Sequence, residues 1–159
     1  MSLVNKYLYF QNPVIINTMK IHTFNETKYK LDSTLLKKIK LSIEQHFPKT
    51  KKHSYNLILI SKSKIRSLKK RLFNKTESTD VIAVNNPERK SLNKGDVYIC
   101  PEVILANAKK FDTAYNEEFA RLVIHGILHL LGFDHKKPFG KSKERIFRIQ
   151  ETLLNKVNE

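Results

Sequence analysis

The chain has 159 residues, a length that favours one domain whose core is large enough to fold without disulfides. Its 30 Lys and Arg residues outnumber its 15 Asp and Glu residues, and the net charge of +15 favours a polyanionic partner, with nucleic acid as the first candidate. The single cysteine, Cys100, excludes an intrachain disulfide and a cysteine-rich metal site, and the longest apolar stretch is far shorter than the ~20 residues that span a bilayer.

The N-terminal half of the chain has the hydrophobic spacing of alternating strands and helices. The elements predicted there are, in chain order, a strand over 14–18, a helix from Asp32 to just before Pro48, a strand over 55–60 and a helix over 63–73. Asp32 is a suitable helix N-cap, and in the helix over 63–73 the residues Ile65, Leu68 and Leu72 would face the core. The first residues lack the long apolar region of a secretory signal, so we expect a cytoplasmic protein with no membrane partner.

The C-terminal half continues the alternation. The elements predicted there are strands over 81–84 and 97–100, followed by helices over about 101–110, 116–131 and 143–156. The two strands are joined by a polar stretch and could pair as neighbours, which would bury Cys100 as a structural thiol. The helix over 116–131 is nearly all apolar and should lie in the core. The pattern as a whole predicts a single α+β domain over 1–159, with one mixed β-sheet packed against helices.

Three of the six histidines fall in the segment HGILHLLGFDH, at positions 125, 129 and 135. On a helix, His125 and His129 would lie on one face with Cβ atoms roughly 5–6 Å apart, so that their imidazoles could bind one metal ion. Gly132 suits the left-handed conformation that ends many helices, after which the chain can bring His135 to the same ion. Three imidazoles without a fourth protein ligand are typical of catalytic zinc sites. The spacing therefore predicts a metal-dependent hydrolase with one bound Zn²⁺.

Simpler interpretations of these residues remain open. Histidines four residues apart also occur on protein surfaces without a metal. Asp134 could orient an imidazole or a water molecule, or it could cap the turn after Gly132. Gly126 stands where H-E-x-x-H proteases carry their general base, which disfavours a peptidase; it either leaves room for metal or substrate or permits tight helix packing. The remaining histidines are expected to be ordinary surface residues: His22, His46 and His53.

The histidine segment resembles the signature of the YbeY endoribonucleases, H-G-x-L-H-L-x-G-aromatic-D-H. Three further blocks are similar to those of the family in order and spacing: TDVI from Thr79, GDVYI from Gly95 and FxxQE from Phe147. Glu118 matches a recurring acidic position. The resemblance covers roughly residues 55–154, and the first fifty residues contribute no motif to it.

This resemblance implies a zincin-like fold in which a buried helix and the loop after it hold one zinc ion through His125, His129 and His135. It implies a zinc-dependent endoribonuclease that is specific for single strands and acts in ribosomal RNA maturation, at the 3′ end of the small-subunit species, and in ribosome quality control. The implied partners are RNA within the ribosomal subunit and, as further candidates, ribosomal proteins; DNA is not expected. The chain departs from the family at Phe73, where many members have a basic residue, and at Ala83, where the family has serine.

Basic side chains near the histidine segment would neutralise phosphate charge, and Arg71, Lys136 and Lys137 are the candidate substrate contacts. Either water or the neighbouring 2′-hydroxyl of RNA could attack the phosphorus, and the sequence leaves both routes open. The main alternative is a non-catalytic, basic RNA-binding ribosome assembly factor whose metal is structural and orders the loop around His135. Structural zinc sites usually have four protein ligands, which disfavours this alternative.

Overall fold

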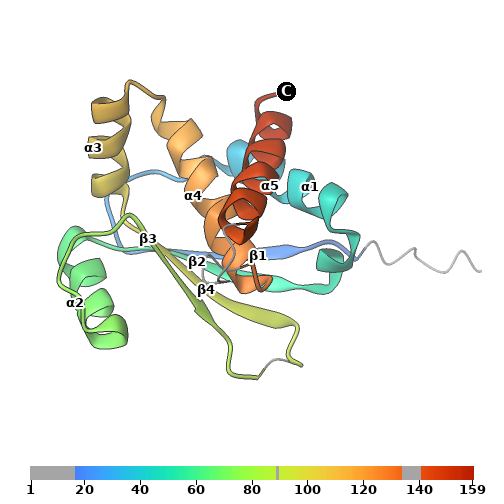
Figure 1. Ribbon diagram of the computed structural model, residues 1–159, viewed down its shortest axis with the longest axis horizontal. Helices are drawn as coiled ribbons and strands as arrows, with labels where there is room; N and C mark the ends of the chain where they lie inside the picture. Colours follow the sequence, from blue (N-terminus) through green and yellow to red (C-terminus); the bar gives the residue numbers. More distant parts are fainter. Residues whose placement is uncertain (1–16, 89, 134–140) are drawn as a thin grey trace, which may run out of the picture.

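The computed structural model describes residues 17–88, 90–133 and 141–159 (Figure 1). Several residues singled out by the sequence lie outside this part of the chain, namely 14–16, Asp134, His135, Lys136 and Lys137. Within it, no helix is long and apolar enough to cross a membrane.

A four-stranded sheet forms the centre of the molecule, with strand order β1-β2-β4-β3. The strands are β1 (Lys20–Asn25), β2 (Ser54–Leu59), β3 (Val81–Asn85) and β4 (Asn93–Ile99). The first two pair in parallel, β2 and β4 also pair in parallel, and β3 runs antiparallel to β4. The sheet is therefore mixed, as predicted.

Helices cover both faces of this sheet (Figure 1). The helices are α1 (Ser33–His46), a short 3₁₀ helix η1 (Pro48–Lys52), α2 (Lys62–Phe73), α3 (Pro101–Phe111), α4 (Tyr115–Leu130) and α5 (Lys141–Asn158). One face carries α4 with α1 and α5 packed around it, and α2 lies on the opposite face. The predicted α+β fold class is thus confirmed.

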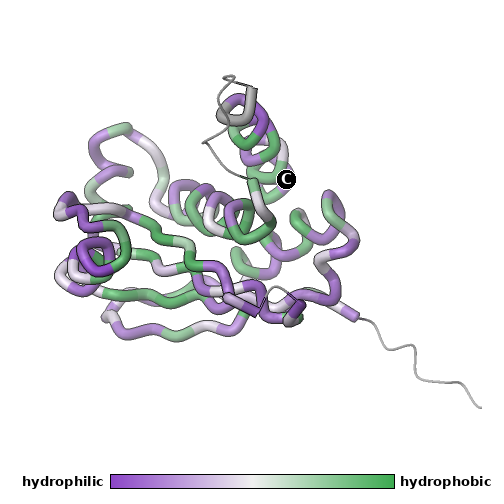
Figure 2. The backbone as a smooth tube through the Cα atoms, turned by 60° about the horizontal axis from the view of Figure 1, so that its bottom comes forward, coloured by the Kyte–Doolittle hydropathy of each residue, from purple (hydrophilic) through white to green (hydrophobic). Residues whose placement is uncertain are grey.

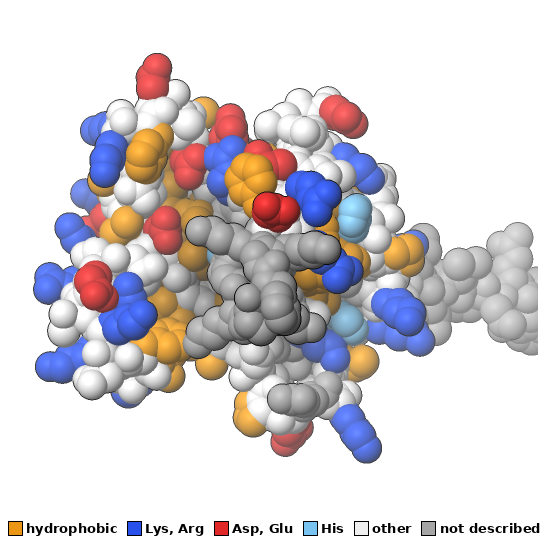
Figure 3. Space-filling view, in the orientation of Figure 1, with side chains coloured by type: hydrophobic (Ala, Val, Ile, Leu, Met, Phe, Trp, Pro, Cys, Tyr) orange, Lys and Arg blue, Asp and Glu red, His pale blue; other side chains and the backbone are white. Residues whose placement is uncertain are grey.

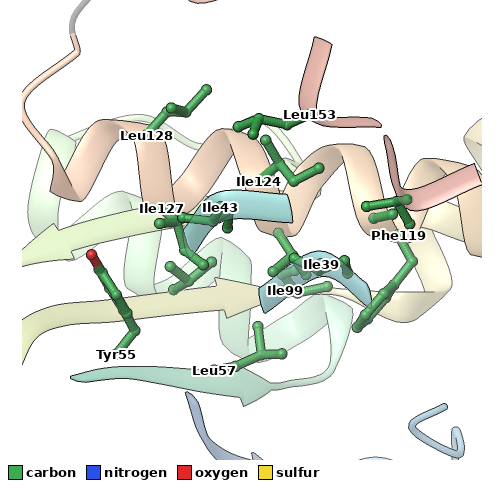
Figure 4. Close-up of a cluster of buried hydrophobic side chains, with 14 of the residues drawn as sticks. Ile39, Ile43, Tyr55, Leu57, Ile99, Phe119, Ile124, Ile127, Leu128 and Leu153 are labelled. Atoms are coloured by element: carbon green, nitrogen blue, oxygen red, sulfur yellow. The ribbon is translucent and has the colours of Figure 1, made fainter. Parts of the chain in front are cut away.

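Alternation along β2 separates two apolar layers. Tyr55, Leu57 and Leu59 point into the larger cluster, which is completed by apolar side chains of α1, α4 and α5 (Figure 4). Ile58 and Ile60 point the other way, toward the smaller cluster under α2. In Figure 2, hydrophobic and hydrophilic residues both occur along the inner strands, whereas hydrophilic residues dominate α2. Because α4 is sandwiched between the sheet and two helices, residues on it have rigid positions.

The approach of α4 to the sheet depends on Gly126. This residue is buried, and a Cβ atom built on it would lie 2.6 Å from Cγ1 of Val97 on β4. Real Cβ atoms are essentially never that close to another heavy atom. Tight helix packing therefore accounts for a glycine at the position where H-E-x-x-H proteases carry glutamate.

Most predicted helices are confirmed, including the N-cap of α1: Asp32 Oδ1 accepts hydrogen bonds from the backbone amides of Thr34 and Leu35 at 2.9 and 3.0 Å. The predicted pairing of the strands over 81–84 and 97–100 as neighbours is also confirmed, by β3 and β4. Cys100 is fully buried, and it follows β4 as the N-cap residue of α3.

Three details of the prediction are wrong. Residues 17 and 18 precede the first strand, which lies over Lys20–Asn25 and shows no apolar alternation because its side chains are almost all exposed. Strand β4 begins at Asn93, four residues before the predicted start at position 97. Leu72 is 42% exposed, because the apolar cluster under α2 ends at Leu68.

Candidate active site

A pocket of about 460 Å³ lies between α4, β3 and the last turn of α2. This volume is within the range of sites that bind small molecules or parts of larger substrates. The described residues that line it are Lys69, Phe73, Thr79, Val81, Ile82, Ala83, Asn85, His125, Gly126, His129, Gly132 and Phe133. The structure thus brings two of the three predicted metal ligands to one pocket wall.

His125 and His129 converge within this pocket. Their Nε2 atoms are 3.0 Å apart, and their rings meet edge to face at a centroid distance of 4.6 Å. Two imidazole ligands of one tetrahedral zinc ion would have nitrogens roughly 3.3 Å apart, given Zn–N bonds of about 2.0–2.1 Å. The observed pair therefore needs little rearrangement to bind one ion.

A glutamine on α5 orients the first of these histidines. His125 Nδ1 lies 2.8 Å from Oε1 of Gln150, which is only 7% exposed. The amide nitrogen of Gln150 donates to the Glu151 carboxylate at 3.3 Å, which defines the orientation of the amide group. Oε1 can only accept, so Nδ1 of His125 carries the proton and Nε2 presents its lone pair to the pocket.

Arg121 holds α4 and α5 together one turn before His125. Its guanidinium group donates to Glu117 at 3.0 Å, to Glu118, and across to Glu151 on α5 at 3.3 Å. This network gives Glu118, the acidic position noted in the sequence, a structural role. It also fixes the segment of α5 that places Gln150 opposite His125.

These residues fit a zinc site. Two imidazoles with converging nitrogens, one of them oriented by a buried hydrogen-bond acceptor, are the donors that zinc prefers. Within residues 17–88, 90–133 and 141–159, no group of three or more His, Cys, Asp or Glu side chains could hold a metal ion. The third predicted ligand, His135, and its neighbour Asp134 lie outside the described residues.

The structure places the predicted substrate contact Arg71 away from the histidine pocket. Arg71 lines a separate groove with Glu26 and Tyr98. Two other residues of α2, Lys69 and Phe73, line the histidine pocket instead. Sequence reasoning noted Phe73 as a departure from the family and missed Lys69, because the orientation of α2 decides which of its flanks faces the pocket.

His53 differs from the expected surface histidine. It is half-buried, and its Nδ1 lies 3.1 Å from Oη of the buried Tyr55. Burial and, next, the positive charge of Lys94 lower the pKa of His53 below its ordinary value. It lines a second pocket, of about 470 Å³, which shares Asn85 and Gly132 with the histidine pocket. The other two histidines are exposed, as expected: His22 and His46.

The fold and the pocket define an α+β protein with a candidate metal site on its buried helix, and comparisons with known proteins identify its family. A family model described as Endoribonuclease YbeY matches residues 16–158. The chain therefore belongs to the YbeY endoribonuclease family. The match includes most of the first fifty residues, in which the sequence analysis found no motif.

Individual relatives agree with this assignment. The chain is 34% identical over 146 residues to the endoribonuclease YbeY of Phytoplasma australiense. This match covers 88% of this chain and 96% of the relative. It is also 34% identical over 126 residues to the endoribonuclease YbeY of Thermotoga petrophila. That match covers 79% of this chain and 82% of the relative. The solution structure of the protein TM1509 from Thermotoga maritima matches with a TM-score of 0.62 and 30% identity, covering 86% of this chain and 88% of the other.

Proposed function

We propose that this protein is a zinc-dependent endoribonuclease that cuts single-stranded RNA in ribosomal RNA maturation, at the 3′ end of the small-subunit species, and in ribosome quality control. Its partners would be the ribosomal subunit and ribosomal proteins, and its location would be the cytoplasm. Membership of the YbeY family supports the ribonuclease activity. The observation that carries the metal dependence is the convergence of the two Nε2 atoms at 3.0 Å inside a pocket.

The candidate site residues have separable tasks in this proposal. A zinc ion bound by His125, His129 and His135 would supply Lewis-acid chemistry at a phosphate ester. Gln150 keeps the proton of His125 on Nδ1, so that Nε2 remains a donor of its lone pair. Lys69, which lines the same pocket, supplies positive charge for the phosphate groups of the substrate.

The direct test is cleavage of a short single-stranded RNA by zinc-loaded protein. Chelator-treated protein and the variant His129→Ala are run beside it, and His22→Ala, an exposed histidine, is the matched control. We expect wild-type and His22→Ala to cut single strands, and we expect the other two samples and duplex RNA to give no products. A folded, zinc-bound protein that binds RNA without cutting it would favour the assembly-factor alternative.

The two chemical routes are separated by the ends of the products. A 2′,3′-cyclic phosphate would exclude water as the first attacking group, whereas a product with only linear phosphate ends and no cyclic intermediate would favour water.

The ribosomal role requires a separate test in cells. Depletion of the protein should leave small-subunit ribosomal RNA with an extended 3′ end, measurable by 3′-end mapping. Wild-type protein should restore the mature end, and His129→Ala should not. Mature ends in depleted cells would contradict this role while leaving the nuclease activity in place.

A further inference from the structure

One flank of α2 combines positive charge with an aromatic ring. Arg66, Lys69, Lys70 and Phe73 follow each other at i, i+3, i+4 and i+7, so they form one stripe along the helix. Two members of this stripe, Lys69 and Phe73, line the histidine pocket. The other two members, Arg66 and Lys70, line a neighbouring groove of about 330 Å³ whose remaining described residues carry hydroxyl groups, namely Ser63, Ser67 and Thr76.

Phe73 is an exposed aromatic residue in the wall of this pocket. It is the last residue of α2, and 53% of its surface is accessible. An exposed ring beside cations suits a nucleobase, which can stack on the ring while its phosphates contact the cations. Figure 3 shows Lys and Arg side chains gathered over α2, at the lower left of the view, with hydrophobic surface beside them.

Lys69 is positioned to contact a phosphate next to such a base. Only 19% of its side chain is exposed, and Nζ lies 3.5 Å from a carboxylate oxygen of Glu77, whose side chain is 70% exposed. A long ion pair to such an exposed partner contributes little free energy. A phosphate oxygen can therefore replace the Glu77 carboxylate at low cost.

We propose that this stripe is a nucleotide subsite, in which the ring of Phe73 stacks one base of single-stranded RNA and Arg66, Lys69 and Lys70 hold the adjoining phosphates. The strand would pass along α2 and enter the histidine pocket at Phe73. This inference rests on the proposed function and adds the way in which the substrate is held. Because every base has a π-face, the subsite tolerates any sequence.

Fluorescence tests the stacking directly, because the chain contains no tryptophan. The variant Phe73→Trp places a single indole in the pocket wall. We expect a single-stranded RNA octamer to quench it strongly, and an abasic ribose-phosphate octamer of the same charge to leave it nearly unchanged. Equal responses to both oligomers, or no response to either, would overturn the proposal.

Phe111→Trp is a closely matched control. Phe111 is also the last residue of its helix, is 61% exposed, follows two lysines and precedes a left-handed residue, yet it lines none of the pockets described above. We expect no base-dependent quenching at this position. Quenching as strong as that of Phe73→Trp would mean that any exposed ring on this basic protein responds to RNA, which would overturn the assignment.

Affinity provides a second measurement. Removal of one stacked base should weaken binding roughly 5- to 150-fold, so Phe73→Ala should show a dissociation constant higher by this factor. Phe73→Tyr keeps the aromatic face and should restore most of the affinity, and thermal unfolding of each variant checks that it is folded. Equal affinities of the Ala and Tyr variants would overturn the subsite.

The two proposals fail in different ways. If wild-type protein cuts RNA but the Phe73 variants bind like wild-type, the subsite is wrong and the nuclease function stands. If the Phe73→Trp signal responds to bases but no condition yields cleavage, the subsite stands and the catalytic function is wrong.

Discussion

A single hydrogen bond from Nδ1–H of His125 to Gln150 fixes the tautomer of this candidate zinc ligand. Gln150→Leu removes the acceptor for Nδ1–H of His125 and should weaken zinc binding 10- to 100-fold. Competition with a fluorescent chelator measures this affinity, and nitrogen NMR of the metal-free protein should show the His125 proton redistributing between its two ring nitrogens. Arg148→Leu, an exposed position on the same helix, is the control. Unchanged zinc affinity in Gln150→Leu would contradict the positioning role.

His53 makes the stability of the fold depend on pH. The folded state lowers its pKa below the ordinary 6.5, first by burial and then through Lys94, so the unfolded chain binds the proton more readily. This stabilisation is complete above about pH 6.5 and is lost as the pH falls below that value toward the folded-state pKa. Urea unfolding at a series of pH values should show a shallower decline for His53→Asn than for wild-type. The same decline in both proteins would refute this role, and His46→Asn serves as the control for removing one exposed histidine.

The close packing of α4 against β4 depends on the contact between Gly126 and Val97. Gly126→Ala should destabilise the fold by about 1–3 kcal/mol, although alanine is the better helix former, because its Cβ would collide with Val97. Urea unfolding measures this destabilisation. In the double variant with Val97→Ala, the two effects should be less than additive, because the smaller side chain makes room for the new methyl group. A Gly126→Ala variant as stable as wild-type would contradict this packing argument.

The spacing of hydrophobic residues in the sequence predicted those helices and strands well that bury one face. The spacing of His125 and His129 was sufficient to predict their shared face, because that relation is fixed within one helix. Gln150 was beyond such reasoning, since its contact with His125 depends on how α4 and α5 pack. The same holds for Phe73 and the pocket, and for β1, whose exposed edge position removes the apolar alternation that reveals a strand.

The positive charge of the whole molecule predicts how RNA binding responds to salt. For single strands, removing one cation that binds a phosphate should reduce the slope of log K against log salt concentration by about 0.7. We therefore expect Lys69→Gln to have a shallower slope than wild-type by roughly that amount. Lys109→Gln, an exposed position on α3, should retain the wild-type slope. Fluorescence anisotropy of a labelled oligomer at several salt concentrations provides both values, and identical slopes would exclude a phosphate-binding role for Lys69.

The contact between Gln150 and His125 also has a consequence for the order in which the protein is made. Translation proceeds from the N-terminus, so the ribosome synthesises α4 before α5. Until α5 has been made and packed against α4, the chain lacks the acceptor that orients His125. In a member of a ribonuclease family, this chain order delays the orientation of a candidate metal ligand until the last helix has been synthesised.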